Sequence, residues 1–489
     1  MRIGIFKLYA SLRIYCIAAL LVSVTACGGG IGAIILLVEG GISGTGISFG
    51  TIAAFASVFV NGTRLEIDSQ TEIFIDEQQV ADETGLKVGF VIRVEADFDN
   101  SIARRIDYIE TVRGPLTTNP VINPDTFAGS FDLLGQTVLT NSATIFDGIA
   151  DVTALAMGNV LDISGVRNST GAVVARYIEL KSPPISDYRL VGIIDSTDPL
   201  AETFRIGNLV VDYMGADISQ LNGGVVEDGI EVRVTGSASS FVSATPSIEA
   251  DKITNSVLAL GIQNGDSVEL EGAVTRFVLI SEMEVNGFPV DASAAVIEDG
   301  NINDIIVDAL VEVEGAVDNA DILVASKIKI IPIDNIRIEA SVDSIDTVNN
   351  TIEVLGRIFQ LNQKTQLDDK SSAKIPQFSL LDISPLDWVE LRGYSKDGSY
   401  FLSRLVRDDP DSDVRLQAPV DENGVGPGST ISMLGIAVPW DVNTSFEDVD
   451  NQSLNESEFF NLVFDGDVVK ARWKDYTSTS VPVDELSLE

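Results

Sequence analysis

The chain has 489 residues, 45% of them apolar, which is enough for several packed domains rather than one core. Its 32 basic and 73 acidic residues give a formal charge of −41, which repels phosphate backbones, so we expect no nucleic-acid partner. The chain contains no histidine, which removes the commonest general base, imidazole metal ligands and every catalytic triad that depends on histidine.

The first 26 residues have the pattern of a secretory signal peptide. Three basic side chains precede a short apolar run, and small residues follow it. The run is shorter than the roughly 20 apolar residues that a membrane-spanning helix needs. We therefore predict that the mature protein is exported.

The end of this segment, Val24-Thr25-Ala26-Cys27, resembles the lipobox of bacterial lipoproteins, with Val24 where leucine is usual. The resemblance implies cleavage before Cys27 and lipidation of that cysteine. Gly28 stands where an aspartate usually signals inner-membrane retention, which implies the outer membrane. Residues 27–45 are rich in glycine and predict a flexible tether. The alternative is an ordinary signal peptide with an incidental cysteine.

A pattern of alternating apolar and polar residues then recurs six times, and its clearest copy is residues 268–331. Such alternation is typical of strands with one buried face. The copies predict six β-modules, of which the last is divergent: residues 46–113, 127–181, 188–254, 268–331, 336–407 and 414–489.

Two elements define the start and the end of a module. Near the start lies a hairpin with an Asn-Gly turn, at Asn61-Gly62 and again at Asn286-Gly287, because both residue types tolerate positive φ. Near the end lies an Ala-x-x-Ile strand, and we hypothesise that its small residue allows another strand to approach closely. Its copies begin at Ala103, Ala175, Ala250 and Ala325.

Between these two elements lies a strand with strict alternation. In residues 230–234 the apolar side chains share one face, while Glu231 and Arg233 share the other. This pattern predicts a half-solvated antiparallel strand with both charged side chains in water.

The modules predict an all-β chain of tandem small antiparallel barrels, similar to an OB-fold, on the N-terminal tether. Open sandwiches are the alternative. Stretches rich in Pro, Asn, Asp or Ser are expected to be linkers between modules: residues 114–127, 182–188 and 408–417.

The first and fourth modules resemble a known family. The first module contains Gly44-Thr45-Gly46-Ile47, Ser57-Val58-Phe59-Val60-Asn61-Gly62 and Leu86-Lys87-Val88-Gly89. These segments, and residues 268–331, are similar to the bacterial domain-of-unknown-function family numbered 5666. Ala54 and Ala56 stand where that family usually has glycine. The resemblance implies a lipoprotein with tandem β-rich modules, and it assigns no functional residues.

Three carboxylates alternate along one expected linker, at Asp409, Asp411 and Asp413, and hard oxygen ligands of this kind suit Ca²⁺. The segment departs from an EF-hand loop, because Val414 and Val420 stand where that loop needs glycine and glutamate. A solvated acidic linker is therefore the alternative interpretation. We expect no other cofactor.

These observations together predict a non-enzymatic lipoprotein of the cell envelope, attached to the membrane through Cys27. Its role would be binding or architectural, and its partner an envelope protein or a glycan. One alternative is a Ca²⁺-stabilised surface adhesion or glycan-binding protein, in line with the acid excess. Another is a carboxylate-dependent hydrolase, which would need two acids about 5–10 Å apart in a pocket.

Overall fold

The computed structural model describes residues 42, 44–54, 57–122, 128–141, 143–256, 262–375, 378–426, 429–449 and 452–488. The predicted signal peptide, the lipidation site Cys27 and most of the tether lie outside these residues. All contacts below belong to the unit formed by residues 36–489.

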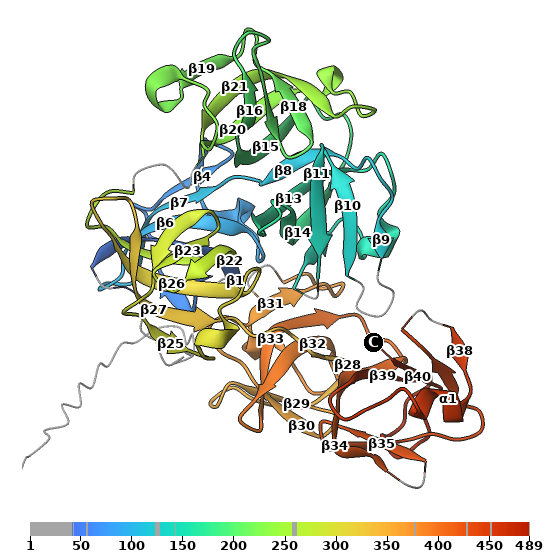
Figure 1. The fold of residues 1–489 in the computed structure, drawn as a ribbon. Coiled ribbons are helices and arrows are strands. Elements are labelled where there is room, and N and C mark those ends of the chain that lie inside the picture. Colours follow the sequence, from blue (N-terminus) through green and yellow to red (C-terminus); the bar gives the residue numbers. More distant parts are fainter. Residues whose placement is uncertain are drawn as a thin grey trace, which may run out of the picture. The chain divides into compact units, whose positions relative to one another are not determined.

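Strands account for nearly all regular structure, which confirms the prediction of an all-β chain (Figure 1). The described residues form 40 strands, six short 3₁₀ helices and one α-helix, α1 at Glu456–Phe460. None of the helices in this described part is long and apolar enough to cross a membrane.

The strands fall into six successive groups, which we number as modules 1 to 6. The first three modules contain the following strands. Module 1 has β1 (Thr45–Ala54), β2 (Val58–Val60), β3 (Thr63–Leu65), β4 (Glu72–Ile75), β5 (Gln78–Val80), β6 (Val91–Asp97) and β7 (Ile102–Tyr108). Module 2 has β8 (Val112–Pro115), β9 (Val121–Ile122), β10 (Gly129–Leu133), β11 (Gln136–Thr140), β12 (Ile145–Asp147), β13 (Val160–Arg167) and β14 (Val173–Lys181). Module 3 has β15 (Asp187–Ile193), β16 (Asp195–Asp198), β17 (Thr203–Ile206), β18 (Leu209–Asp212), β19 (Asp217–Gln220), β20 (Glu231–Ser237) and β21 (Ser247–Asn255).

The last three modules follow the same order. Module 4 has β22 (Ser267–Leu279), β23 (Glu282–Val285), β24 (Phe288–Asp291), β25 (Val296–Glu298), β26 (Leu310–Val317) and β27 (Leu323–Ile330). Module 5 has β28 (Ile336–Asp346), β29 (Thr351–Val354), β30 (Arg357–Gln360), β31 (Gln366–Asp369), β32 (Trp388–Lys396) and β33 (Ser399–Asp408). Module 6 has β34 (Val414–Gly426), β35 (Thr430–Met433), β36 (Ile436–Pro439), β37 (Ser445–Glu447), β38 (Ser453–Leu454), β39 (Val468–Trp473) and β40 (Glu485–Leu488). The 3₁₀ helices are η1 (Glu83–Gly85), η2 (Val152–Ala154), η3 (Asn222–Gly224), η4 (Ala238–Ser240), η5 (Ile302–Asp304) and η6 (Leu380–Asp382).

Module 4 shows how the strands pair within a module. The first strand, β22, pairs antiparallel with β23 and with β26. From β23 the pairing continues to β24, then in parallel to β27, and from β27 back to β26. Module 5 repeats this circuit with β28, β29, β30, β33 and β32. Each circuit therefore returns to the strand from which it began.

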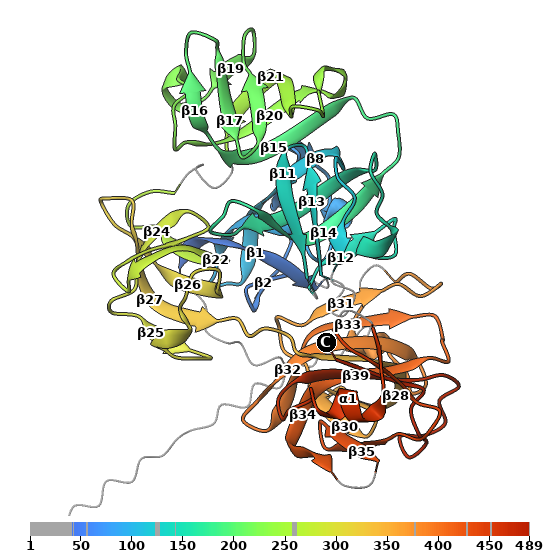
Figure 2. The same ribbon diagram turned by 45° about the vertical axis from the view of Figure 1, so that its right-hand side comes forward.

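The first strands also join modules to one another in pairs. Strand β1 pairs in parallel with β22, whereas β8 pairs with β15 and β28 with β34 in antiparallel fashion. Both views show β1 beside β22 (Figures 1 and 2). The pairings produce three sheets of 13, 14 and 13 strands, which hold modules 1 and 4, 2 and 3, and 5 and 6. The sheets thus extend through the repeats, as in a β-solenoid, and the modules are not separate units on linkers.

Three apolar cores follow the same pairs, whereas a fourth combines residues of module 1 with Ile145 and Tyr177 of module 2. One core draws all its buried residues from modules 5 and 6, and another draws all of them from modules 2 and 3. A third places Ile47 and Phe49 of β1 among the apolar residues of module 4. Trp440 and Trp473 lie in the first of these cores, at 7% and 1% exposure, so both side chains contribute to its packing.

The Asn-Gly turns have the predicted backbone. Asn61 and Gly62 have φ of 52° and 79°, and Asn286 and Gly287 have 50° and 77°. The Asn286 side chain also bonds back to the first strand, because its Nδ2 donates to the Glu271 carbonyl oxygen at 3.0 Å. The turn therefore attaches the hairpin to the first strand of its own module.

The close approach proposed for the Ala-x-x-Ile strand exists, and in modules 2 to 5 a glycine on the facing strand allows it, whereas module 1 has Ala96 there. The register shifts at Gly315, opposite Ala325, and at Gly393, opposite Leu402. A Cβ at Gly315 would lie 2.2 Å from the Val324 carbonyl oxygen. Each shift is a β-bulge, which bends the strand where the circuit turns.

Threonine hydroxyls, which the sequence analysis did not single out, hold the same strand in place. Four modules carry a threonine three residues after Asp or Asn, and its Oγ1 donates to a carbonyl oxygen of the last strand or just before it. The bonds are Thr71 to Ala103 (2.7 Å), Thr144 to Ala175 (2.8 Å), Thr365 to Leu402 (2.7 Å) and Thr444 to Val483 (2.7 Å).

One expected linker is wrong. The stretch at residues 114–127 contains the end of β8 and all of β9, and β8 is the strand through which module 2 joins module 3. Residues 123–127 of this stretch lie outside the described residues.

Candidate functional site

The polar faces of several alternating strands are buried, although the sequence pattern predicts that they are solvated. Arg233 is 5% exposed, and Glu312 and Glu314 are 1% and 5% exposed. Apolar and polar residues alternate along these strands as expected. The prediction failed because another module packs against the polar face of each strand. These covered faces form two charged clusters and border two cavities.

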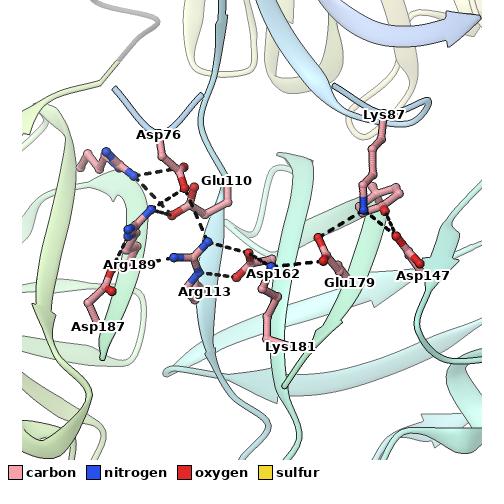
Figure 3. Close-up of polar contacts among 12 residues, drawn as sticks. Asp76, Lys87, Glu110, Arg113, Asp147, Asp162, Glu179, Lys181, Asp187 and Arg189 are labelled. Carbon is pink, nitrogen blue, oxygen red and sulfur yellow. Dashed lines mark hydrogen bonds and ion pairs between the residues drawn. The ribbon is translucent and has the colours of Figure 1, made fainter. Parts of the chain in front are cut away.

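The first cluster, which we call the arginine network, joins modules 1, 2 and 3 (Figure 3). Arg113 of β8 lies directly opposite Arg189 of β15, a pairing of like charges that is unfavourable alone. The β4–β5 turn of module 1 supplies Asp76, which lies 2.6 Å from Arg189 and 3.5 Å from Arg113. The acid at the hairpin tip therefore compensates the two arginines of the shared sheet.

Other acids complete the arginine network. Glu110, between β7 and β8, lies 3.0 Å from Arg189 and 3.3 Å from Arg233. Arg113 donates to both carboxylate oxygens of Asp162, at 2.5 and 2.7 Å. Such bidentate pairs fix geometry as well as charge.

From Asp162 the arginine network extends towards the surface. Lys181 lies between Asp162 and Glu179, at 3.5 and 3.1 Å (Figure 3). Lys87 of module 1 then pairs with Asp147 of module 2 at 2.6 Å. Both side chains of the Lys87–Asp147 pair are more than a third exposed, so this pair contributes little to stability, unlike the buried centre.

The two central acids, Glu110 and Asp76, have pKa values shifted in opposite directions. Burial and the neighbouring Asp76 raise the pKa of Glu110 to about 8. Burial acts in the same direction on Asp76, but its hydrogen bond with Glu110 and the facing arginines hold the pKa of Asp76 below its ordinary value. One proton shared between the two carboxyl groups is consistent with both directions.

The second cluster, the glutamate cluster, consists of Glu269, Glu312 and Glu314, which offer carboxylate oxygens within 4.8 Å of one another. Strand pairing causes this proximity, because Glu269 of β22 lies directly opposite Glu314 of β26. Module 1 contributes Ser48 of β1, whose hydroxyl donates to Glu269 at 2.8 Å.

Three lysines neutralise the glutamate cluster. Lys329 lies 3.1 Å from Glu312 and 3.5 Å from Glu314. Lys327 lies 2.9 Å from Glu314, and Lys364 of module 5 lies 2.7 Å from Glu312. A divalent cation would have to displace Lys329, so the residues present fit an ion-pair cluster better than a metal centre.

Burial, together with the facing Glu312, raises the pKa of Glu269 to about 8. A folded-state pKa above the ordinary value of 4.5 means that the folded protein keeps a proton which the unfolded chain releases. This stabilisation is complete below about pH 4.5 and is lost as the pH rises to about 8, by at most about 1.4 kcal/mol per pH unit.

We therefore expect Glu269→Gln to lose less stability than the wild type between pH 5 and pH 8. Urea unfolding at both pH values measures the difference. The exposed Glu66→Gln is the matched control and should follow the wild type. Equal losses in Glu269→Gln and the wild type would contradict the assignment. Some pH dependence should persist in Glu269→Gln, because the pKa of Glu110 is raised in the same direction.

The structure does not bring the sequence-predicted Ca²⁺ ligands together. The carboxylate of Asp409 accepts the Ser372 amide at 2.9 Å, and that of Asp411 accepts the Ser412 amide at 2.6 Å. The Asp413 carboxylate pairs with Arg472 instead. Among the described residues, the acids grouped closely enough to share a cation are those of the glutamate cluster.

Two cavities lie beside the clusters. One has a volume of about 330 Å³ and is bordered by modules 1 to 4, with Arg93 and Arg167 in its wall. The other, which we call the junction cavity, has a volume of about 400 Å³ and is bordered by modules 1, 2, 4 and 5. Both volumes fall within the roughly 300–1,000 Å³ typical of small-molecule sites.

Six of the seven charged side chains that border the junction cavity form ion pairs, and the seventh, Asp334, accepts a hydrogen bond from the Ser403 hydroxyl at 2.6 Å. Arg176 lies 3.1 Å from Glu271, and Lys364 lies 2.7 Å from Glu312. Lys396 forms a third pair with Asp299, which places a module 5 cation against module 4. The wall therefore presents opposite charges side by side rather than a field of one sign.

The sequence pattern does not predict either cluster or either cavity, although it contains one signal for the glutamate cluster. Glu312 and Glu314 are spaced by two residues, as are Lys327 and Lys329 on the following strand. Antiparallel pairing across the Gly315 bulge places Glu312 opposite Lys329 and Glu314 opposite Lys327. This matching favours a charged cross-strand ladder. Its burial depends on modules 1 and 5, which no local pattern indicates.

One family model matches the chain four times, and its description is Domain of unknown function (DUF5666). The matches cover residues 49–107, 114–179, 271–329 and 339–401, about half of the chain, in modules 1, 2, 4 and 5. Modules 3 and 6 contain the same order of strands without a match. No curated protein matched the chain.

Proposed function

Because the chain belongs to the DUF5666 family and repeats its domain in tandem, we propose that it is a non-enzymatic lipoprotein of the cell envelope with a binding or architectural role. One observation carries the proposal: strand pairing joins modules that are distant in sequence, as β1 joins β22. Such a body holds its surfaces and cavities in a preformed arrangement, which favours binding because little ordering is needed.

The proposed anchor is Cys27, and the supporting observation is the lipobox-like segment that ends there. Several acyl chains together hold a protein stably on a membrane, since each buried methylene contributes about 0.8 kcal/mol. The membrane would be the outer membrane, on account of Gly28.

Fatty-acid labelling in a Gram-negative host tests the anchor. We expect the wild type to incorporate the label and to sediment with the outer membrane. Cys27→Ser should lose the label and should not be retained there. The matched control is Cys16→Ser, which changes the other cysteine and should behave as the wild type. An unlabelled wild type would overturn the proposal.

We also propose that each module is a small barrel similar to an OB-fold. The support is the pairing circuit in modules 4 and 5, with its one parallel contact between third and last strands. A module pair with its own core should then fold alone, so a chain of residues 332–489 should unfold in one cooperative transition. A stack of mutually dependent layers would leave this fragment unfolded.

A further inference from the structure

The junction cavity has an aromatic wall that neither the ion pairs nor the proposed anchor requires. Tyr394 of β32 and Phe401 of β33 both border it, with ring centroids 5.7 Å apart and planes inclined by 20°. Both rings are only partly buried. Aromatic rings at the edge of a cavity with polar groups in its wall suit a ligand with one apolar face and a polar rim.

The charges of the junction cavity favour a neutral ligand. An anion would have to take Arg176, Lys364 or Lys396 from its carboxylate. A cation would have to do the reverse, or to approach Asp334, whose carboxyl group already interacts with the positive charges of Arg392, Arg176 and Arg404. The pairs of Arg176 and Lys364 each contain a largely buried carboxylate, so removing their cation leaves an uncompensated charge, which is strongly unfavourable, whereas the pair of Lys396 is more exposed. A ligand without net charge avoids this cost and still bonds to the paired groups.

Buried oxygen atoms of residues that border the junction cavity lack a hydrogen-bond partner among the described residues. Gln366 is 9% exposed and borders the cavity, and among the described residues its Oε1 accepts no hydrogen bond. Asp334 Oδ1 is likewise buried without a partner in the described part of the chain. A buried polar atom without a partner costs about 1–3 kcal/mol, so a ligand or a bound water that supplies one is favoured.

Two asparagines add hydrogen-bond donors to the same wall. The side-chain oxygen of Asn141 accepts the Ala143 amide at 2.9 Å, and that of Asn362 accepts the Lys364 amide at 2.9 Å. These bonds hold the side chains in place and direct the amide oxygens towards the backbone. The Nδ2 groups of both residues are the donors that these bonds leave for a ligand.

We propose that the junction cavity binds a neutral saccharide, with one pyranose ring stacked on the aromatic wall and its hydroxyls bonded to Gln366, Asn141 and Asn362. A pyranose combines an apolar C–H face with hydroxyls that both donate and accept, which matches this wall. The inference rests on the proposed binding role and names its ligand class.

Binding of defined oligosaccharides to the purified full-length protein in detergent tests the inference. The probes are neutral oligosaccharides ending in glucose, galactose, mannose or N-acetylglucosamine, with sialylated and phosphorylated counterparts. We expect at least one neutral probe to bind at millimolar concentration or below, with and without EDTA. Failure of every neutral probe, or tighter binding of the charged counterparts, would overturn the inference.

Variants locate the site. Gln366→Leu and Tyr394→Ala should each weaken binding at least tenfold, whereas Tyr394→Phe should keep most of it. The matched control is the exposed Gln70→Leu in module 1, which should bind as the wild type. Thermal unfolding of each variant shows whether it is folded. Unchanged binding in both folded cavity variants would place the saccharide elsewhere and overturn the assignment.

The proposed anchored binding role and the proposed saccharide site can be disproved independently of each other. Loss of saccharide binding with intact fatty-acid labelling would remove only the ligand, and the anchored binding role would stand. A protein that is unlabelled but binds the saccharide through Gln366 would remove the anchor and leave the cavity assignment in place.

Discussion

Lys329→Met will destabilise the folded protein by about 3–5 kcal/mol, since it removes one partner of a buried ion-pair cluster. Lys329 is 3% exposed and contacts both Glu312 and Glu314, so methionine leaves two remaining lysines to face three buried carboxyl groups. Equilibrium unfolding in urea measures the loss as a lower transition midpoint with an unchanged slope.

The matched control lies in the same module. Arg276 pairs with Glu282 on an exposed surface, with side chains 46% and 52% exposed, so Arg276→Met should leave the midpoint almost unchanged. The double variant Lys329→Met/Glu312→Gln should recover part of the loss, because it removes a carboxylate along with its cation. A Lys329→Met protein as stable as the wild type would show that the glutamate cluster is not charged as described.

Gly393→Val is expected to destabilise the protein by about 3 kcal/mol through overpacking at the bulge of module 5. A Cβ at Gly393 would lie 2.0 Å from the Phe401 carbonyl oxygen, and that oxygen belongs to the backbone, which cannot rotate away. The strands β32 and β33 would have to separate or shift register at the point where the circuit turns.

A graded series makes this prediction specific. Ser395→Val places the same side chain on an exposed position of the same strand and should have little effect. Gly393→Ala should cost less than valine, because module 1 accommodates Ala96 at the corresponding bulge opposite Ala103. Equal stability of the two valine variants, measured by thermal unfolding, would contradict the role of the close approach.

The charged clusters explain why the modules form pairs and larger contacts rather than a loose chain. Facing arginines or facing glutamates on adjacent strands repel each other unless another module supplies the opposite charge. Asp76 does this for Arg113 and Arg189, and Lys364 does it for Glu312. Each cluster therefore favours the native pairing of modules over a wrong pairing, so it contributes to the specificity of module assembly.

Local patterns were sufficient where neighbouring residues determine the conformation. Alternation predicted strands because side chains of a strand point alternately to two faces, and the Asn286-Gly287 turn followed from its tolerance of positive φ. The tandem repeat and the family resemblance were visible for the same reason, and the family match confirms them.

Patterns failed where a contact depends on residues far apart in the chain. Arg233 and Glu312 have the same alternating context as solvated side chains, yet each is buried. The linker prediction at residues 114–127 failed for a related reason, since Gly114 and Pro115 of β8 pair with Leu161 and Val160 of β13, more than 40 residues further on.

The amino-acid sequence alone determined the strand content, the six repeats and their turns, since these follow from backbone preferences and from residues a few positions apart. Only the tertiary structure decided which modules share a sheet, which charged faces are buried and where the cavities lie. The physical reason is that alternation along a strand shows only that one of its faces is apolar. Whether another module packs against the polar face depends on complementary charges that the other module carries.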